Sequence, residues 1–561
     1  MTRASGPTGD NETPTPRPGS RADRFAQPLA RHVVQTVAAE NGVCLRPLPM
    51  RRTDLTTGQT EIIPVPCGAT LASVCPACAE KARKLRMAQC AAGWHLDHEP
   101  LPTPKPPTDE AKTLARLRAD LEAVRADVEH DPAQVADTDR LIDEVDQALA
   151  DLGVRGKAAP DARDRPRRAR STRRRQDAPD LPRLPVDKRT VGRTFTAPDG
   201  TVWRPSLFLT LTCPSYGPIV DGAPVNPDRY DYQRAARDAI HFPKLIDRFW
   251  QNLRRAIGWN VQYFATLEPQ QRLAPHLHAA IRGTIPRALL RQVAAATYTQ
   301  IWWPAHDVPV YPTGTPGPVW DDTAGGYADP GSGALLPTWE QALDAIGPDD
   351  EPAHVSRFGE QVRADGVTAN SRTAGRLIGY LTKYLTKSLD ACHTVDDDRR
   401  RAHLDRFADA LRHEPCAPTC PNWLRYGVQP RNARPGQAPG RCKGKAHRRD
   451  TLGFGGRRVL LSRAWSGKTL TDHKADRRDW IRDQLAVLAP AGGDDGQDQT
   501  DDNRLHLWEL ARPGEPGVPR REHLILRAIA DRSAWRLQLQ AAQATANAPP
   551  ALPATDAPHA A

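Results

Sequence analysis

The chain has 561 residues, enough for several domains, but its 54 prolines and a mean hydropathy of −0.61 indicate that part of it is linker. Lysine and arginine exceed aspartate and glutamate by 78 to 67, and the resulting net charge of +11 favours a polyanionic partner. No run of about 18 apolar residues and no apolar core of a secretory signal is present, which excludes a membrane protein. We therefore expect a cytoplasmic protein.

Both ends of the chain are polar and rich in proline, so residues 1–30 and 546–561 are predicted to be disordered tails. Eight of the ten cysteines fall into two clusters, one within residues 44–90 and one within residues 416–442. In a reducing compartment, clustered cysteines indicate metal binding more than disulfide bonds.

The first cysteine cluster predicts a small zinc module over residues 31–100. Cys75 and Cys78 have the spacing of a structural zinc site, and Cys67 is close enough in sequence to join them. The fourth ligand stays open among Cys44, Cys90 and, as weaker alternatives, His95 and His98.

Residues 101–190 are predicted to form a helical hairpin followed by a basic linker. Apolar residues recur at helical spacing over residues 109–152, with a break at Asp131-Pro132. Residues 155–175 carry ten basic residues against two acidic ones, a composition that cannot build a core. This segment is either a solvated linker or a flexible clamp on DNA phosphates.

Residues 191–395 are predicted to form an α+β domain around an antiparallel sheet. SLFLTLTCPS has the period-2 alternation of a strand with one packed side. The following elements are predicted as a helix over 234–257, strands over 261–268 and 276–283, a helix over 286–303, an insertion over 304–352, a strand over 354–362 and a helix over 379–388. This is the split βαβ order, with helices on one face of the sheet.

The third strand carries a histidine pair. His276 and His278 project to the same side of the strand, because side chains alternate, and Glu268 on the neighbouring strand can reach them. Two imidazoles and a carboxylate can hold a divalent cation with open coordination positions. Taken alone, the pair would also fit ordinary, partly exposed histidines.

The last helix of this region carries tyrosines and lysines on one face. Tyr380, Lys383, Tyr384 and Lys387 fall within an arc of about 100° on a helix. The stripe fits an amphipathic helix with extended lysines, but it also fits a covalent mechanism in which a tyrosine attacks a phosphodiester.

Residues 396–480 are basic and contain the second cysteine cluster, and residues 481–545 are predicted to form C-terminal helices. A second zinc site is predicted from residue types that suit zinc, namely Cys416, Cys420, Cys442 and His447, with His413 just ahead. SGKT at residues 466–469 lacks the first glycine of a phosphate-binding loop, because Ser462 stands there, so no ATPase is predicted.

Three motifs in order resemble those of HUH endonucleases, the enzymes that initiate rolling-circle replication: TLT in LFLTLTCPS, His276-Leu277-His278, and YLTKYLTK. The upstream cysteines and the stretch LEPQQRLAPHLHAAIR resemble the replication initiators of actinobacterial plasmids and integrative elements. The resemblance covers most of residues 40–480.

This resemblance implies a nickase with an HUH endonuclease-like fold. His276, His278 and Glu268 would hold Mg²⁺ or Mn²⁺. The structural Zn²⁺ predicted from the cysteine spacing would fold the N-terminal module, which we expect to recognise or clamp origin DNA. Tyr384 would attack first and Tyr380 would be a second nucleophile, while Lys383 or Lys387 stabilises the phosphate or phenolate. The product is a 5′-phosphotyrosyl adduct and a free 3′-hydroxyl primer.

The implied partners are single- and double-stranded DNA at a plasmid origin, with a host helicase, polymerase and single-strand-binding protein. Two other functions remain open. The same residues would serve a two-tyrosine transposase or a relaxase, although relaxases usually carry a third histidine and an N-terminal tyrosine. A zinc-stabilised DNA-binding regulator without catalysis is the alternative of another class.

Overall fold

The structure is a computed structural model that describes Ser20 and residues 28–546. Internal gaps in the described residues are 95, 97, 101–107, 129–131, 152–174, 176, 193, 197, 201, 348, 369, 393–396, 456–457 and 489–505. Nearly all of the two predicted tails, and of the basic segment 155–175, therefore lies outside the described residues. The chain divides into two compact units, one formed by residues 101–176 and the other by the rest.

The smaller unit is a pair of helices, α4 (Asp109–Asp127) and α5 (Pro132–Asp151), joined at the predicted break. Thr108 caps α4 by accepting a hydrogen bond from the amide of Ala111. The two helices are tied together by Arg118, whose guanidinium lies 2.5 Å from Asp146 across the hairpin.

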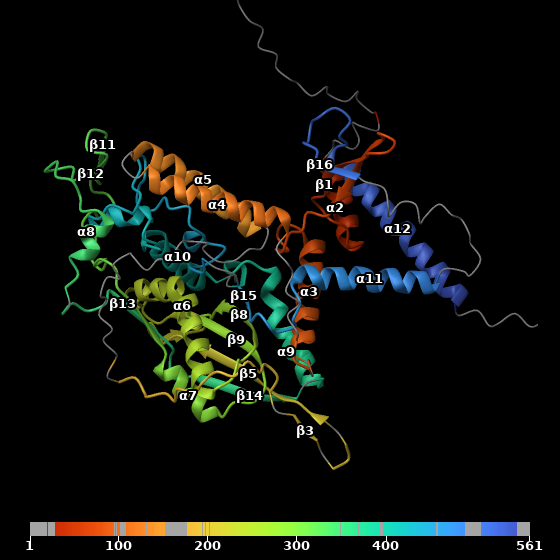
Figure 1. Ribbon diagram of the computed structural model, residues 1–561, viewed down its shortest axis with the longest axis horizontal. Helices are drawn as coiled ribbons and strands as arrows, with labels where there is room; N and C mark the ends of the chain where they lie inside the picture. The colour runs from red at the N-terminus through yellow and green to blue at the C-terminus, as the bar shows by residue number, and fades with distance from the viewer. Residues whose placement is uncertain are drawn as a thin grey trace, which may run out of the picture. The chain divides into compact units, whose positions relative to one another are not determined.

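The larger unit is built around a five-stranded antiparallel sheet in the order β14-β5-β9-β8-β15 (Figure 1). Its strands are β14 (Val362–Thr368), β5 (Pro205–Thr212), β9 (Pro275–Arg282), β8 (Tyr263–Pro269) and β15 (Val459–Leu461). The β9 strand lies in the middle of this order, which explains why all eight of its residues are buried.

Both faces of this sheet are covered by helices. Leu209, Leu277 and the other residues that point to the first face pack against α6 (Tyr232–Ile257), the long helix between β5 and β8. On the second face, Phe208 and Phe264 pack with α3 (Pro76–Trp94) and α9 (Arg372–Lys383). The structure confirms the antiparallel sheet. The expectation of helices on only one face was wrong, because α3, from the N-terminal part, and α9 bury the second face.

Two predicted elements of the central region differ in the structure. The helix expected over 286–303 ends early, as α7 (Arg287–Ala296), and is followed by β10 (Tyr298–Ile301). The β10 segment contains Tyr298, Thr299 and Ile301, and aromatic and β-branched residues favour a strand. The strand expected over 354–362 is β13 (His354–Arg357), which pairs with β10, while β14 supplies the edge of the main sheet.

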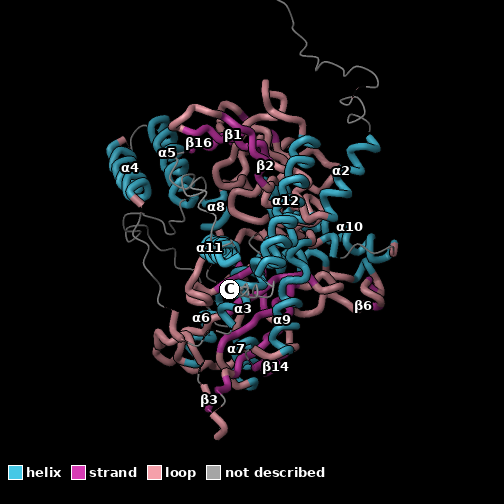
Figure 2. Tube along the Cα trace, turned by 90° about the vertical axis from the view of Figure 1, so that its right-hand side faces the viewer, coloured by secondary structure: helices cyan, strands magenta, loops and turns pink. Residues whose placement is uncertain are grey.

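The N-terminal and C-terminal parts of the larger unit share one small sheet (Figure 2). It has the order β16-β1-β2, formed by β1 (Leu48–Asp54), β2 (Thr60–Val65) and β16 (His506–Leu510). Beside it, α12 (Arg521–Ala546) packs against α2 (Pro28–Glu40) through Ile525, Val34 and Ala38. The segment expected to hold only C-terminal helices therefore also contributes a strand.

The segment between β10 and β13 contains β11 (Val319–Asp321), β12 (Gly326–Ala328) and α8 (Trp339–Asp344). It packs on the 3₁₀ helix η4 (Pro421–Tyr426) through Trp339 and Trp423.

The other elements are β3 (Phe195–Thr196), β4 (Val202–Trp203), β6 (Ile219–Val220), β7 (Ala223–Pro224), η1 (Pro227–Arg229), η2 (Tyr384–Thr386), η3 (Asp390–Cys392), α10 (Asp398–His413), η5 (Lys445–His447) and α11 (Leu470–Leu488). None of the described helices is both long and apolar enough to cross a membrane.

Candidate active site and metal centres

The histidine pair lies on the face of the sheet that α9 covers. In the register of the three central strands, His276 pairs with Thr212 of β5 on one side and with Glu268 of β8 on the other. His278 lies two residues further along β9, opposite Thr210. Strand alternation therefore brings all of these side chains to one end of one face. The sequence led us to expect this for His276, His278 and Glu268.

Threonine side chains from β5 orient both imidazole rings. Hydrogen bonds join Thr212 Oγ1 to His276 Nδ1 at 2.5 Å and Thr210 Oγ1 to His278 Nδ1 at 3.1 Å. Nε2 is therefore the nitrogen that each ring can offer to a cation, and Glu268 Oε1 lies 3.0 Å from Nε2 of His278. The TLT motif was noted in the sequence, but no role was assigned to Thr210 or Thr212.

The ligand atoms of Glu268, His276 and His278 all lie within 4.8 Å of one another. Burial, followed by the nearby charges of His278 and Arg272, lowers the pKa of His276 to about 3, so this ring is neutral at physiological pH. An imidazole pair beside a carboxylate fits a divalent cation. The two nitrogen ligands suit Mn²⁺ better than Mg²⁺, which prefers oxygen.

Tyr380 reaches this group from α9. The helix begins after Ser371, which caps it, and packs on the sheet through Ala374, Ile378 and Leu381. The Tyr380 hydroxyl lies 3.0 Å from Nε2 of His278. Burial, followed by the charges of Glu268 and Tyr384, raises the pKa of Tyr380 to about 12, so its hydroxyl is protonated in the structure as it stands.

Tyr384 lies beyond the end of the helix. The α9 helix stops at Lys383, Tyr384 opens the 3₁₀ turn η2, and Lys387 has extended backbone angles. The expectation of one helix face for all four residues was therefore wrong after Lys383. Tertiary hydrogen bonds explain the change, because the amide of Ala72 donates to the Thr386 carbonyl and Arg458 donates to the Lys387 carbonyl.

The side chain of Tyr384 has a different environment from that of Tyr380. The Lys383 ammonium lies 5.1 Å from the centre of the Tyr384 ring. Among the described residues, the Tyr384 hydroxyl forms no hydrogen bond. Of the two tyrosines, only Tyr380 contacts the histidine pair there.

Four N-terminal cysteines, Cys44, Cys67, Cys75 and Cys78, form a second group with all ligand atoms within 4.8 Å. The sulfurs of Cys67 and Cys78, and those of Cys75 and Cys44, are each 3.8 Å apart. Tetrahedral zinc with Zn–S bonds of about 2.3 Å requires S···S distances of about 3.8 Å, so the group fits a metal such as zinc. Backbone amides also donate to the sulfurs of Cys44 and Cys75, which stabilises thiolates.

The alternatives for the fourth ligand lie elsewhere. Cys90 is fully buried between α3 and the sheet, where it packs with Trp94 and Phe264. His98 is not part of the cysteine group, and His95 lies outside the described residues. Cys44 was one of the open possibilities, and the structure places it with the other three.

The second predicted zinc site is also assembled. The ligand atoms of Cys416, Cys420, Cys442 and His447 lie within 4.8 Å of one another, and Cys420 Sγ is 3.5 Å from His447 Nε2. His447 Nδ1 donates to the Leu411 carbonyl at 2.7 Å, which leaves Nε2 free to bind. These four residues fit a Cys₃His zinc site. His413 is not part of the group.

Comparison with known proteins identifies the family. A family model described as "Replication initiator protein, pSAM2" matches residues 30–531. A replication initiator protein of Streptomyces ambofaciens is 27% identical over 229 residues, a match covering 34% of this chain and 44% of that protein. No solved structure matches the chain. Because the family model covers most of its length, the chain belongs to the pSAM2 replication initiator family.

Proposed function

We propose that this replication initiator nicks one strand of a plasmid double-strand origin by tyrosine transesterification, with an HUH endonuclease-like domain over residues 191–395. The observation that carries the proposal is the position of the Tyr380 hydroxyl, which lies 3.0 Å from Nε2 of His278. His278 belongs to the possible metal-binding group with His276 and Glu268. A nucleophile is thus adjacent to residues that can bind a cation on a phosphate. This combination suits phosphodiester chemistry.

In the proposed reaction, a tyrosine oxygen attacks the scissile phosphorus and the bond from phosphorus to the 3′ oxygen breaks. The tyrosine loses its proton, the released 3′ oxygen gains one, and a 5′-phosphotyrosyl bond forms. The energy of that bond is available for rejoining the strand. A divalent cation held by His276, His278 and Glu268 would neutralise charge on the phosphate during attack.

Two tyrosines are candidates for the attack. The family resemblance assigns the first attack to Tyr384, whereas the contact with His278 favours Tyr380. They are four residues apart, so one could act in initiation and the other in termination. Lys383, between them, and Lys387 are exposed cations that can balance the charge of a bound phosphate.

The free 3′-hydroxyl would prime rolling-circle synthesis by host polymerase, with a host helicase and single-strand-binding protein. The two cysteine groups would hold Zn²⁺ and stabilise the parts of the chain that contact DNA. Family membership supports an initiator over the transposase and relaxase alternatives.

The experiment is incubation of purified protein with 5′- and 3′-labelled single-stranded origin oligonucleotides and Mn²⁺, followed by a denaturing gel. We expect a 5′-linked protein–DNA adduct that His276→Ala abolishes. One of the two variants Tyr380→Phe and Tyr384→Phe should also abolish the adduct, and that variant identifies the nucleophile. Tyr311→Phe is the matched control, because this tyrosine bonds Asp329 in the 304–352 segment. Binding of the origin without cleavage under any divalent cation would instead support the non-catalytic regulator.

A further inference from the structure

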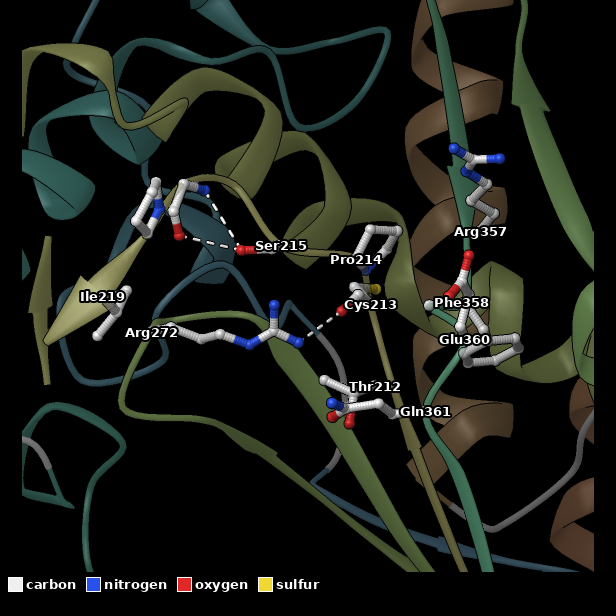
Figure 3. Close-up of a pocket in the computed structure, with 13 residues that line it drawn as sticks. Thr212, Cys213, Pro214, Ser215, Ile219, Arg272, Arg357, Phe358, Glu360 and Gln361 are labelled. Atoms are coloured by element: carbon white, nitrogen blue, oxygen red, sulfur yellow. Dashed lines mark hydrogen bonds between the residues drawn. The ribbon is translucent and has the colours of Figure 1, made fainter. Parts of the chain in front are cut away.

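A pocket of about 580 Å³ (Figure 3) opens beside the histidine pair. Three segments line it: residues 212–219 after β5, residues 357–361 before β14, and Arg272 from the loop between β8 and β9. In Figure 3, Arg272 lies on one side, and Arg357, Phe358 and Glu360 lie on the other. The pocket has no role in the chemistry described above.

The pocket and the histidine group are directly connected. Thr212 lines the pocket, and its hydroxyl is the one that bonds Nδ1 of His276. The sheet register explains this proximity, because the end of β5, the start of β9 and the start of β14 lie side by side. A DNA strand with its scissile phosphate at the histidines would have a neighbouring nucleotide at the pocket.

The side chain of Arg272 is held in a fixed position. Its Nε donates to Gln270 Oε1 at 2.7 Å and its Nη2 donates to the Cys213 carbonyl at 2.8 Å. The next residue, Leu273, has a φ of 58° and is almost fully buried, an unusual backbone conformation that the surrounding core maintains. The Tyr230 hydroxyl donates to the Arg272 carbonyl. The loop therefore presents the guanidinium with little freedom.

The charge of Arg272 is not matched by a carboxylate. No acidic group lies within ion-pair distance of its guanidinium among the described residues, and two of its five N–H donors are used. By contrast, the buried Arg237 pairs with both Glu414 and Asp307. A positioned guanidinium with free donors on the wall of a pocket is suited to bind an anion, and arginine matches phosphate geometry well.

The pocket offers no exposed ring on which a base could stack. Phe358, its one aromatic lining residue, is 6% exposed and packs against Phe242 and Phe249. With the Arg272 guanidinium on its wall and no exposed ring among its lining residues, the pocket favours the sugar-phosphate backbone over a base. Backbone contacts of this kind position a strand without reading its sequence.

We infer that this pocket binds a phosphodiester of the single strand immediately next to the scissile phosphate, with Arg272 as the phosphate-binding residue. The inference rests on the proposed function for the identity of the ligand. It assigns Arg272 to positioning of the DNA, since its guanidinium contacts a flanking phosphate rather than the reacting atoms.

The test is a binding scan without added Mg²⁺ or Mn²⁺ and without chelator, so that the proposed nicking does not occur and the two cysteine groups keep any bound zinc. Single-stranded origin oligonucleotides each carry one neutral methylphosphonate at a successive position around the nick, and their affinity for the full-length protein is measured. We expect wild type to lose about tenfold or more in affinity at one flanking position. Arg272→Gln should bind the unmodified strand about as weakly as wild type binds the strand modified at the sensitive position. Modification at that position should cost Arg272→Gln no further affinity. Arg272→Lys should lie between the two.

Arg401→Gln is the matched control, because this α10 arginine already pairs with Asp398, and it should reproduce the wild-type scan. The inference is overturned if no flanking position matters in wild type, or if Arg272→Gln keeps the full loss at the sensitive position. The wild-type scan and Arg272→Lys decide the question if Arg272→Gln is unfolded. Cleavage of the unmodified strand with Mn²⁺, measured in parallel, tests the nickase separately from the pocket.

Discussion

Substitution of Gly93 by alanine tests whether the N-terminal part is locked to the central sheet. Gly93 is in the last turn of α3, and an added Cβ would lie 2.5 Å from Cγ of Trp465 and closer still to two other indole atoms. Trp465 is fully buried, and its Nε1 donates to the Gln89 carbonyl at 3.2 Å. The indole therefore has little room to move.

Two opposing effects set the magnitude. Alanine in place of glycine inside a helix stabilises by about 1 kcal/mol, whereas overpacking a rigid core typically costs about 1–3 kcal/mol and sometimes more. Arg282 of β9 contacts both residues: it donates to the Gly93 carbonyl at 3.0 Å, and its guanidinium lies 5.4 Å from the centre of the Trp465 ring. These contacts restrict how far either residue can shift. We expect Gly93→Ala to lower the free energy of unfolding by about 2 kcal/mol.

The assay is thermal unfolding followed by circular dichroism, with Gly375→Ala as the control. Gly375 is in α9, and a Cβ added there would meet no atom of the described residues within 4 Å, so alanine should raise the midpoint. Gly93→Ala should lower it, and adding Trp465→Leu should remove much of the difference. If both glycine substitutions raise the midpoint, the packing of α3 on Trp465 is refuted.

Three further predictions concern the metal groups and the buried charges. Elemental analysis of the purified protein should give two zinc ions per chain, and one after either Cys78→Ser or Cys442→Ser; unchanged zinc in either variant would contradict that site. Folded His276 has a pKa of about 3 against an ordinary 6.5, so the unfolded chain binds the proton first, and stability should fall as pH drops from 6.5 towards 3. His276→Gln should flatten this dependence in unfolding measurements, and an unchanged slope would argue against the burial of this ring. Arg237→Ala leaves the carboxylate of Glu414 buried without its 2.8 Å partner, and should cost about 3–5 kcal/mol in denaturant unfolding, with part of the loss recovered by Glu414→Gln in the same chain.

Much of the central site could be predicted because its determinants are local. Alternation along one strand is sufficient to place His276 and His278 on the same side, and the short connection between β8 and β9 brings Glu268 opposite them. The zinc-like cysteine spacings are equally local. The structure brings together the residues that these patterns selected.

Other features depend on contacts between distant segments, which local patterns do not contain. The choice between Cys44 and Cys90 is decided by which one points into the core beside Trp94. The end of α9 before Tyr384 depends on a hydrogen bond from Ala72, more than 300 residues earlier. Arg272 gave no signal in the sequence, because its unpaired charge and fixed position are visible only in three dimensions.

The pairing of β16 with β1 has a consequence for how the protein is made. Residues 48–54 leave the ribosome early, but their partner strand, residues 506–510, is synthesised more than 450 residues later. Until then one edge of β1 has unpaired backbone groups, which are a template for association with other chains. A nascent or prematurely terminated chain that ends before residue 506 would therefore carry an incomplete N-terminal sheet, and the third strand is added only once residues 506–510 have been made.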